Sequence, residues 1–126
     1  MYRERMETLK EWKVSKNRKP LIIRGARQVG KTWLMKEFGK LYYEKCAYIN
    51  FDNNSRMDIL FNEEFDLNRI IQGLKIESGI NIEPENTLII FDEIQETPNA
   101  LKALKYFYEN ANEYHIVAAG SLLGVA

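Results

Sequence analysis

The chain has 126 residues, of which 45% are hydrophobic and 29% charged, as expected of an ordinary globular protein with one domain. It holds no run of about 18 apolar residues that would span a membrane, and its N-terminus lacks the apolar segment of a secretory signal. The single cysteine, Cys46, excludes an internal disulfide and a cysteine-only metal cluster, so we expect a protein of the reducing cytoplasm.

The hydrophobic pattern predicts helices and strands that alternate along the chain. Helices are expected over residues 2–14, from near Lys31, over about 66–76, and from Thr97-Pro98, where threonine is the N-cap and proline the first helical residue. Strands are expected over 21–24, 47–51, 88–91 and 115–119. The acidic stretch 52–64 is expected to be irregular, and 77–86 to be a loop.

This alternation predicts an α/β fold, in which helices cover both faces of a parallel sheet. Ligands of such sheets bind outside the carboxyl ends of the strands. Three polar segments follow predicted strands in this sequence, namely the loop 25–32, the pair Asp92-Glu93 and the pair Gly120-Ser121. We therefore expect these segments to converge on one rim of the sheet.

The loop after the first strand, GARQVGKT, has the spacing G-x-x-x-x-G-K-[ST] of the phosphate-binding P-loop. Gly25 and Gly30 are expected to adopt backbone conformations that a Cβ would hinder, so that N–H groups turn toward a phosphate. The following helix would add its N-terminal dipole. Lys31 is expected to reach the β- and γ-phosphates, and the Thr32 hydroxyl to ligate Mg²⁺.

The four residues between these glycines are expected to contribute mainly backbone groups; they are Ala26, Arg27, Gln28 and Val29. For Arg27 two interpretations stay open, a solvated loop charge and a contact to a partner or a phosphate. A dinucleotide site is disfavoured, because the spacing is not G-x-G-x-x-G.

A second motif, LIIFDE, is an apolar strand that ends in two acids and matches the Walker B pattern. Asp92 is expected to hold Mg²⁺ directly or through water. Glu93 points differently and is the candidate to orient and polarise a water for attack on the γ-phosphate. Ser121 is either a hydrogen-bond donor to that phosphate or water, or an ordinary turn serine. The only histidine, His115, is expected to be structural.

Taken in order, KPLIIRGARQVGKT, YINFD, LIIFDEIQ and AAGSLLG resemble the ATPase core of the AAA+ superfamily over nearly the whole chain. The chain also resembles bacterial and archaeal predicted AAA-type ATPases that join this core to a helical lid and a nuclease-like C-terminal domain of uncertain function. The resemblance implies ATP and Mg²⁺ as ligands. It places Walker A at Gly25 to Thr32, Walker B at Asp92 and Glu93, and sensor 1 at Ser121.

The resemblance also implies a three-layer αβα sandwich of the P-loop NTPase (AAA+-like) kind, truncated after the fourth core strand. One domain is expected over 1–126, with an N-terminal helix and connection at 1–19 and the nucleotide-binding core at 20–126. The family continues with a fifth strand and a lid, so we expect an N-terminal fragment whose strand 21–24 is an exposed edge open to self-association. Hydrolysis is expected to be slow, because an arginine finger contributes about 10³–10⁵ in kcat and none is identified here.

The leading functional hypothesis is Mg-ATP binding with slow hydrolysis that drives or regulates an attached domain or a protein partner. The alternatives are a nucleotide-dependent switch with little turnover and, less favoured, a small-molecule kinase, since no lid rich in arginine and lysine follows Asp92. Whether the fragment itself is an active ATPase stays open. No membrane partner is expected.

Direct nucleic-acid binding is weakly supported by the charge distribution. Residues 1–49 hold 13 Lys or Arg and 5 Asp or Glu (net +8), whereas residues 50–100 hold 3 and 11 (net −8). The basic part is either a phosphate-binding patch or a solvated face that is neutralised on folding. The absence of a cluster of base-stacking aromatic residues favours the second interpretation.

Overall fold

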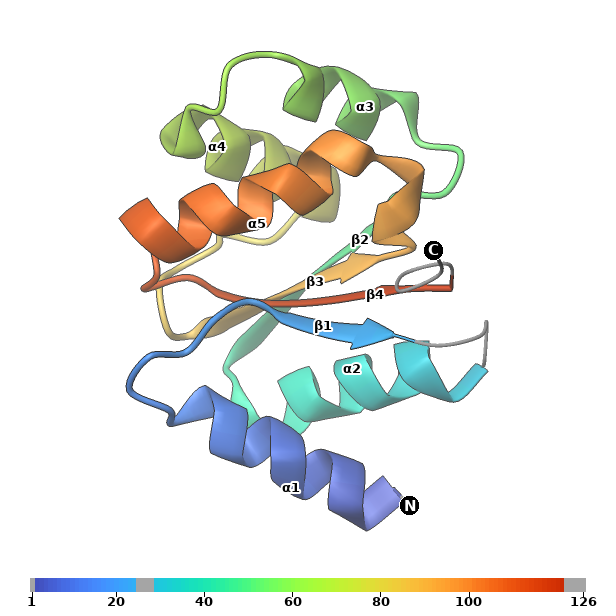
Figure 1. The fold of residues 1–126 in the computed structure, drawn as a ribbon, viewed down its shortest axis with the longest axis vertical. Coiled ribbons are helices and arrows are strands. Elements are labelled where there is room, and N and C mark those ends of the chain that lie inside the picture. Colours follow the sequence, from blue (N-terminus) through green and yellow to red (C-terminus); the bar gives the residue numbers. More distant parts are fainter. Residues whose placement is uncertain (1, 25–28, 122–126) are drawn as a thin grey trace.

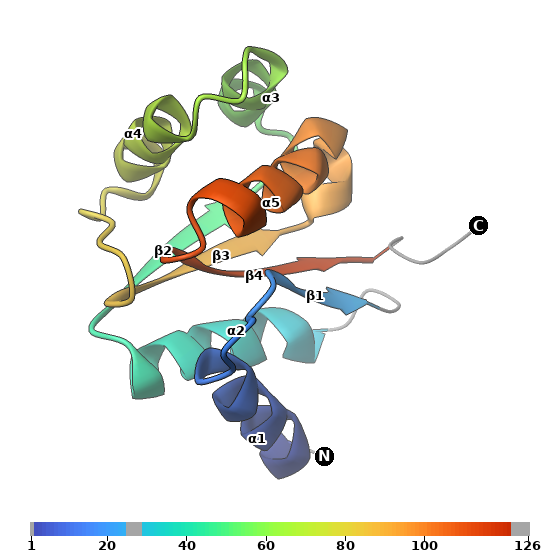
Figure 2. The same cartoon turned by 60° about the vertical axis from the view of Figure 1, so that its left-hand side comes forward.

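The computed structural model describes residues 2–24 and 29–121, which form one parallel sheet between two layers of helices (Figure 1). The strands are β1 (Leu21–Arg24), β2 (Lys45–Asn50), β3 (Thr87–Asp92) and β4 (His115–Gly120). The helices are α1 (Tyr2–Lys13), α2 (Val29–Tyr42), α3 (Ser55–Asn62), α4 (Leu67–Ser78) and α5 (Pro98–Asn110), together with the short 3-10 helix η1 (Ile94–Glu96). Helices α1 and α2 lie on one face of the sheet and α3, α4 and α5 on the other, as Figures 1 and 2 show. The predicted three-layer α/β fold is confirmed.

The strand order across the sheet is β1-β4-β3-β2, and all neighbours are parallel. All residues of the two central strands β3 and β4 are buried, which explains why both are continuous apolar runs. Within the described ranges β1 pairs only with β4. A groove of about 520 Å³ lies beside it, lined by Ile22 and Arg24 of β1 and by Leu101 and Tyr108 of α5. The prediction that strand 21–24 is an edge is confirmed.

A separate hydrophobic core fills each side of the sheet. On the side of α3, α4 and α5, the rings of Phe51, Phe61 and Phe91 pack with centroids 5.1 to 6.0 Å apart. On the other side, Phe38 of α2 is fully buried and packs against Trp12, with ring centroids 6.2 Å apart. These two cores hold both helical layers against the sheet.

Helix α1 is part of the second core. Among the side chains described in this helix, Met6 and Leu9 are buried, being 5% and 2% exposed, and they lie one helical turn apart. The indole N–H of Trp12 donates to the carbonyl of Lys19 across the connection to β1. The N-terminal helix therefore packs on the sheet through its apolar face, and a hydrogen bond near its C-terminal end joins it to the connection that leads to β1.

The prediction of irregular chain over 52–64 is wrong, because α3 occupies Ser55–Asn62. The Asn54 side chain accepts the backbone N–H of Met57 and caps the helix. Met57 and Phe61, four residues apart, are both buried and anchor this short helix to the core. The prediction relied on the acidic composition of residues 52–64 and overlooked the helical spacing of Met57 and Phe61.

Thr97 and Pro98 begin α5 at the predicted positions, but the threonine side chain makes no cap hydrogen bond. Its hydroxyl donates instead to Asp58 Oδ1 of α3, at 2.7 Å. The strand at 47–51 begins two residues earlier than predicted, at Lys45. Over the part of the chain that the structure describes, none of the helices combines the length and the apolar composition that crossing a membrane requires.

We predict that Leu9→Ala lowers the free energy of unfolding by about 2–5 kcal/mol, because it empties a buried site between α1 and the sheet. Leu41→Ala in α2 is the matched control, since Leu41 is 51% exposed and its loss costs less than about 1 kcal/mol. Urea unfolding of the two variants measures both values. Equal, small losses would show that α1 is not packed on the domain.

Candidate functional site

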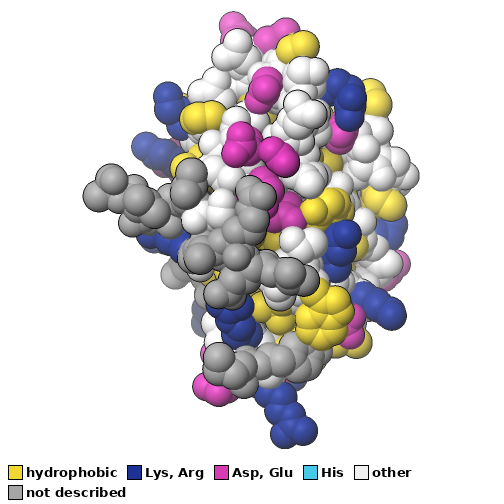
Figure 3. Space-filling model, turned by 90° about the vertical axis from the view of Figure 1, so that its right-hand side faces the viewer, with side chains coloured by type: hydrophobic (Ala, Val, Ile, Leu, Met, Phe, Trp, Pro, Cys, Tyr) yellow, Lys and Arg dark blue, Asp and Glu magenta, His cyan; other side chains and the backbone are white. Residues whose placement is uncertain are grey.

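The carboxyl ends of the parallel strands meet at one edge of the sheet, which is the face seen in Figure 3. The register pairs Arg24 of β1 with Gly120 of β4, and Asp92 of β3 with Ala119 of β4. Ser121 directly follows Gly120 and is half-buried. The strand ends that carry Asp92, Glu93 and Ser121 are thus level with one another. Asp and Glu side chains gather in the upper and central part of this face.

Asp92 lies at the centre of a hydrogen-bond network at this edge. Its Oδ2 atom accepts the Thr32 hydroxyl at 2.7 Å and the Tyr48 hydroxyl at 2.7 Å. Its Oδ1 atom accepts the backbone N–H of Glu93 at 3.0 Å. The carboxylate is 6% exposed and is held from α2, β2 and its own strand. The structure therefore brings together Thr32 and Asp92, which are 60 positions apart in the sequence.

The Thr32 hydroxyl has a defined direction in this network. A hydroxyl carries one proton and two lone pairs. Since the Thr32 hydroxyl donates its hydrogen bond to Asp92, both lone pairs of the threonine oxygen remain available to accept hydrogen bonds or to bind a metal. A hydroxyl and a carboxylate are oxygen donors of the kind that Mg²⁺ prefers, usually together with phosphate and water. Among the described residues no group of three His, Cys, Asp or Glu side chains is arranged to hold a metal alone. The residues present thus fit a magnesium ion that a phosphate helps to bind.

Lys31 and Gly30 lie in the first turn of α2, which is the end that faces the same edge. Lys31 is only 6% exposed, which is unusual for a lysine, and it directly precedes Thr32, which bonds Asp92 at the end of β3. No acidic residue stands in this first turn, so the helix dipole and Lys31 add positive potential. The remaining loop residues predicted to bind phosphate, 25–28, lie outside the described residues.

The prediction that Gly30 has a backbone conformation closed to other residues is wrong in this structure. Gly30 is helical, and Gly79 is the only glycine with a positive φ among those described. A Cβ added to Gly30 would meet no atom of the described residues within 4 Å. Packing against the described part of the chain therefore does not require this glycine.

Glu93 has an unusual backbone conformation immediately after Asp92. Its φ of 55° and ψ of 45° are left-handed, which costs about 1 kcal/mol or more for a residue with a Cβ. Its Oε1 atom accepts the Gln95 amide at 2.9 Å, and the same amide nitrogen lies 3.3 Å from Glu96 Oε2. Because two carboxylates face this amide, its nitrogen must point toward them. The Gln95 carbonyl oxygen is then buried and has no hydrogen-bond partner among the described residues.

Sequence reasoning missed two side chains of this network, Tyr48 and Gln95. Tyr48 was predicted only as a strand residue, yet its hydroxyl reaches Asp92 from the neighbouring strand. Burial, followed by the hydrogen bond to Asp92, raises the pKa of Tyr48, so its phenol keeps the proton that it donates. Gln95 ends the string LIIFDEIQ, in which neither residue type nor spacing indicates its bond to Glu93.

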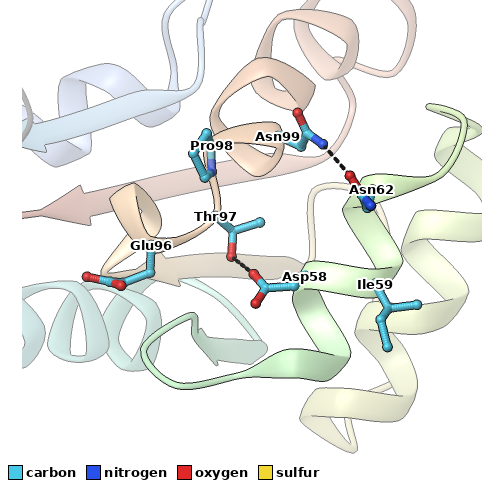
Figure 4. A pocket seen from close by; sticks show the side chains of 7 residues that line it. All are labelled: Asp58, Ile59, Asn62, Glu96, Thr97, Pro98 and Asn99. Atoms are coloured by element: carbon cyan, nitrogen blue, oxygen red, sulfur yellow. Dashed lines mark hydrogen bonds between the residues drawn. The ribbon is translucent and has the colours of Figure 1, made fainter.

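A cleft of about 490 Å³ lies between α3, η1 and the start of α5 (Figure 4). Asp58 and Thr97 point toward each other across it, joined by the 2.7 Å hydrogen bond, and Asn99 bonds Asn62 at 3.2 Å. Two of the residues that line this cleft are acidic and none is basic. This composition does not suit an anionic ligand, so the start of α2 is the better phosphate site.

His115 and Cys46 do not belong to the site. His115 begins β4, at the end of that strand opposite Ser121, and its Nδ1 atom is 2.6 Å from the Tyr43 hydroxyl. Burial, and then the nearby charges of Arg18 and Lys13, lower the pKa of His115 to about 4. Burial raises the pKa of the Cys46 thiol to about 11, which leaves it unreactive at neutral pH.

Comparison with known proteins gives a family and a fold. Residues 17–126 match the sequence model of a family described as "AAA domain". Among solved structures the chain is similar to C. elegans PCH-2, with a TM-score of 0.58 and 16% sequence identity over 99% of this chain and 38% of that chain. The chain thus spans 38% of the length of this relative, and the likeness shows the fold alone. A search of curated proteins finds no match.

We predict that the protein loses stability as the pH falls from about 6.5 toward 4, because His115 has a lower pKa when folded than when unfolded. The unfolded chain then binds more protons, and the stability present above pH 6.5 is lost through this window. His115→Gln keeps a polar partner for Tyr43 and does not titrate. Between about pH 7 and 4.5 the parent should lose about 1–2 kcal/mol more than this variant. Parallel pH curves in urea unfolding would contradict a buried neutral His115.

Proposed function

Since this chain belongs to the AAA domain family, we propose that it binds ATP with Mg²⁺ and hydrolyses it slowly. The observation that carries this proposal is the hydrogen bond between Thr32 and Asp92, at 2.7 Å. It joins the start of a helix to the end of a buried strand, next to a buried lysine. A phosphate would meet positive charge and backbone N–H groups at this point, and a metal would meet oxygen atoms.

Each residue of the site has a proposed role. The backbone of Gly25 to Thr32 surrounds the phosphates, and the absence of a Cβ at Gly30 leaves space for them. Lys31 binds the β- and γ-phosphates. Thr32 and Asp92 hold Mg²⁺, which supplies charge neutralisation at the phosphate oxygens when it is bound.

Glu93 and Ser121 are the proposed residues for the attacking water. Glu93 accepts a hydrogen bond from the water and orients it toward the γ-phosphate. Ser121, at the end of the adjacent strand, donates to the γ-phosphate or to the same water. Its position two residues beyond Ala119, which pairs with Asp92, supports this role.

The wider role is a cycle of nucleotide binding and hydrolysis that drives or regulates an attached domain or a protein partner in the cytoplasm. We propose that residues 1–19 and 20–126 form one unit, with the N-terminal helix packed on the nucleotide-binding core. The unit would belong to an ATPase with a nuclease-like C-terminal domain, as the sequence resemblance implies. The edge of β1, which pairs only with β4 among the described residues, and the groove beside it would bind a partner or a second copy.

A nucleotide-dependent switch with little turnover is the second candidate. It is favoured by the hydrogen bond that Gln95 donates to Glu93, because this bond holds Oε1 of the carboxylate that hydrolysis would use. In that case the protein would respond to ATP or ADP by a change of shape. Among the described residues near the site, no side chain supports a small-molecule kinase.

Lys31→Ala is expected to weaken the binding of ATP and of ADP by about 10- to 100-fold, because it removes a charge-assisted hydrogen bond to phosphate. Lys40→Ala is the matched control, since Lys40 is exposed at the other end of the same helix. Calorimetric titration of both variants measures the affinities. Unchanged affinity in Lys31→Ala would exclude the P-loop as the nucleotide site.

Glu93→Gln is expected to reduce ATP turnover by about 100-fold or more while nucleotide affinity is retained, because the variant loses the basic carboxylate and keeps its shape. Glu96→Gln, the neighbouring acid that also faces Gln95, serves as the control and should retain turnover. Release of inorganic phosphate gives the rates. A parent rate as low as that of Glu93→Gln would favour the switch over the enzyme.

A further inference from the structure

We propose that Tyr48 is a positioning residue for the metal-bound nucleotide. Its hydroxyl holds Asp92 in the orientation in which Oδ2 accepts the Thr32 hydroxyl, so that the Thr32 lone pairs and the remaining acceptor position of Asp92 Oδ1 are available to Mg²⁺ or to its bound water. Tyr48 thereby sets the part of the nucleotide affinity that depends on Mg²⁺. This inference rests on the proposed function, since it assigns a residue to the same site.

The first argument is the geometry at Asp92 Oδ2. This one oxygen atom accepts two hydroxyl groups, each at 2.7 Å, Thr32 from α2 and Tyr48 from β2. A carboxylate oxygen has two acceptor positions, so both are filled. The carboxylate is unable to rotate without breaking one of these bonds or the bond from Glu93 N–H to Oδ1. Hydrogen bonds from α2, from β2 and from the residue after β3 therefore hold the Asp92 side chain in a single orientation.

The second argument concerns what holds Tyr48 itself. The Lys36 ammonium lies 4.1 Å from the centre of the Tyr48 ring, in cation–π contact. Lys36 follows Thr32 by four residues on α2, so both side chains lie on the same side of that helix. The ring is thus fixed by the helix that also supplies Thr32, and the hydroxyl is directed at Asp92. Thr32, Asp92, Tyr48 and Lys36 thus form a continuous series of contacts that begins and ends on α2.

The consequence for the metal follows from the protons. The hydroxyl groups of Tyr48 and Thr32 each donate a hydrogen bond to Asp92 through their only proton. The lone pairs of the threonine oxygen therefore remain available to a ligand. Without the tyrosine hydroxyl, one acceptor position of Oδ2 is open and the carboxylate is free to turn toward water. Partners that orient metal ligands in this way commonly contribute about 10- to 100-fold to metal affinity.

The test compares Tyr48→Phe with the parent in calorimetric titrations of ATP, with Mg²⁺ and with a chelator. The variant keeps the ring and its contact with Lys36, and removes one oxygen atom. We expect the gain in affinity that Mg²⁺ gives the parent to fall by about 10-fold or more, and the affinity in chelator to stay the same. Tyr43→Phe is the control, because Tyr43 bonds His115 away from the site and its loss should leave the Mg²⁺ gain intact.

Three results would overturn the inference. A Mg²⁺ gain in Tyr48→Phe equal to that of the parent would show that the hydroxyl does not serve the metal. An equal loss with and without Mg²⁺, accompanied by a lower melting temperature, would make Tyr48 a residue of the fold only. A parent without nucleotide affinity would reject the proposed function, and the inference together with it.

Discussion

The hydrogen bond between Thr32 and Asp92 is the interaction on which the site depends. It links the first turn of α2 to the end of β3, two points that only the folded sheet brings within 2.7 Å. The Thr32–Asp92 bond requires that β3 is buried on both faces and that α2 packs against the sheet. Both conditions are met by the two cores, of which Phe91 and Phe38 are fully buried members. The packing of the domain therefore determines the geometry of the site.

Unfavourable local features are concentrated next to this bond. Lys31 and Asp92 are buried charged residues, Glu93 is left-handed without being a glycine, and Gln95 has a buried carbonyl oxygen without a partner among the described residues. Each feature opposes folding on its own. Their proximity at the carboxyl edge is typical of functional sites, where the remainder of the fold supplies the stability that such groups require. The two acidic residues that line the cleft beside α3, Asp58 and Glu96, are by contrast exposed.

The sequence predicted the alternation of strands and helices and the meeting of Thr32, Asp92 and Ser121 at one edge of the sheet, because these follow from apolar periodicity and from parallel topology. It did not predict α3, since Met57 and Phe61 stand within acidic residues and their pairing is visible only against the core. Tyr48 and Gln95 were missed for a different reason. A side-chain hydrogen bond depends on register and rotamer, and neither leaves a trace in the spacing of residue types.

The most direct measurement is a map of backbone amide chemical shifts during titration of the protein with Mg-ADP. We expect the largest changes at Gly30 to Thr32, at Asp92 and Glu93, and at Ser121, which the sheet places at one edge. Saturation of these shifts at a single affinity would establish one nucleotide site centred on Thr32 and Asp92. Changes confined to the cleft lined by Asp58 and Thr97, or no changes at all, would contradict the account.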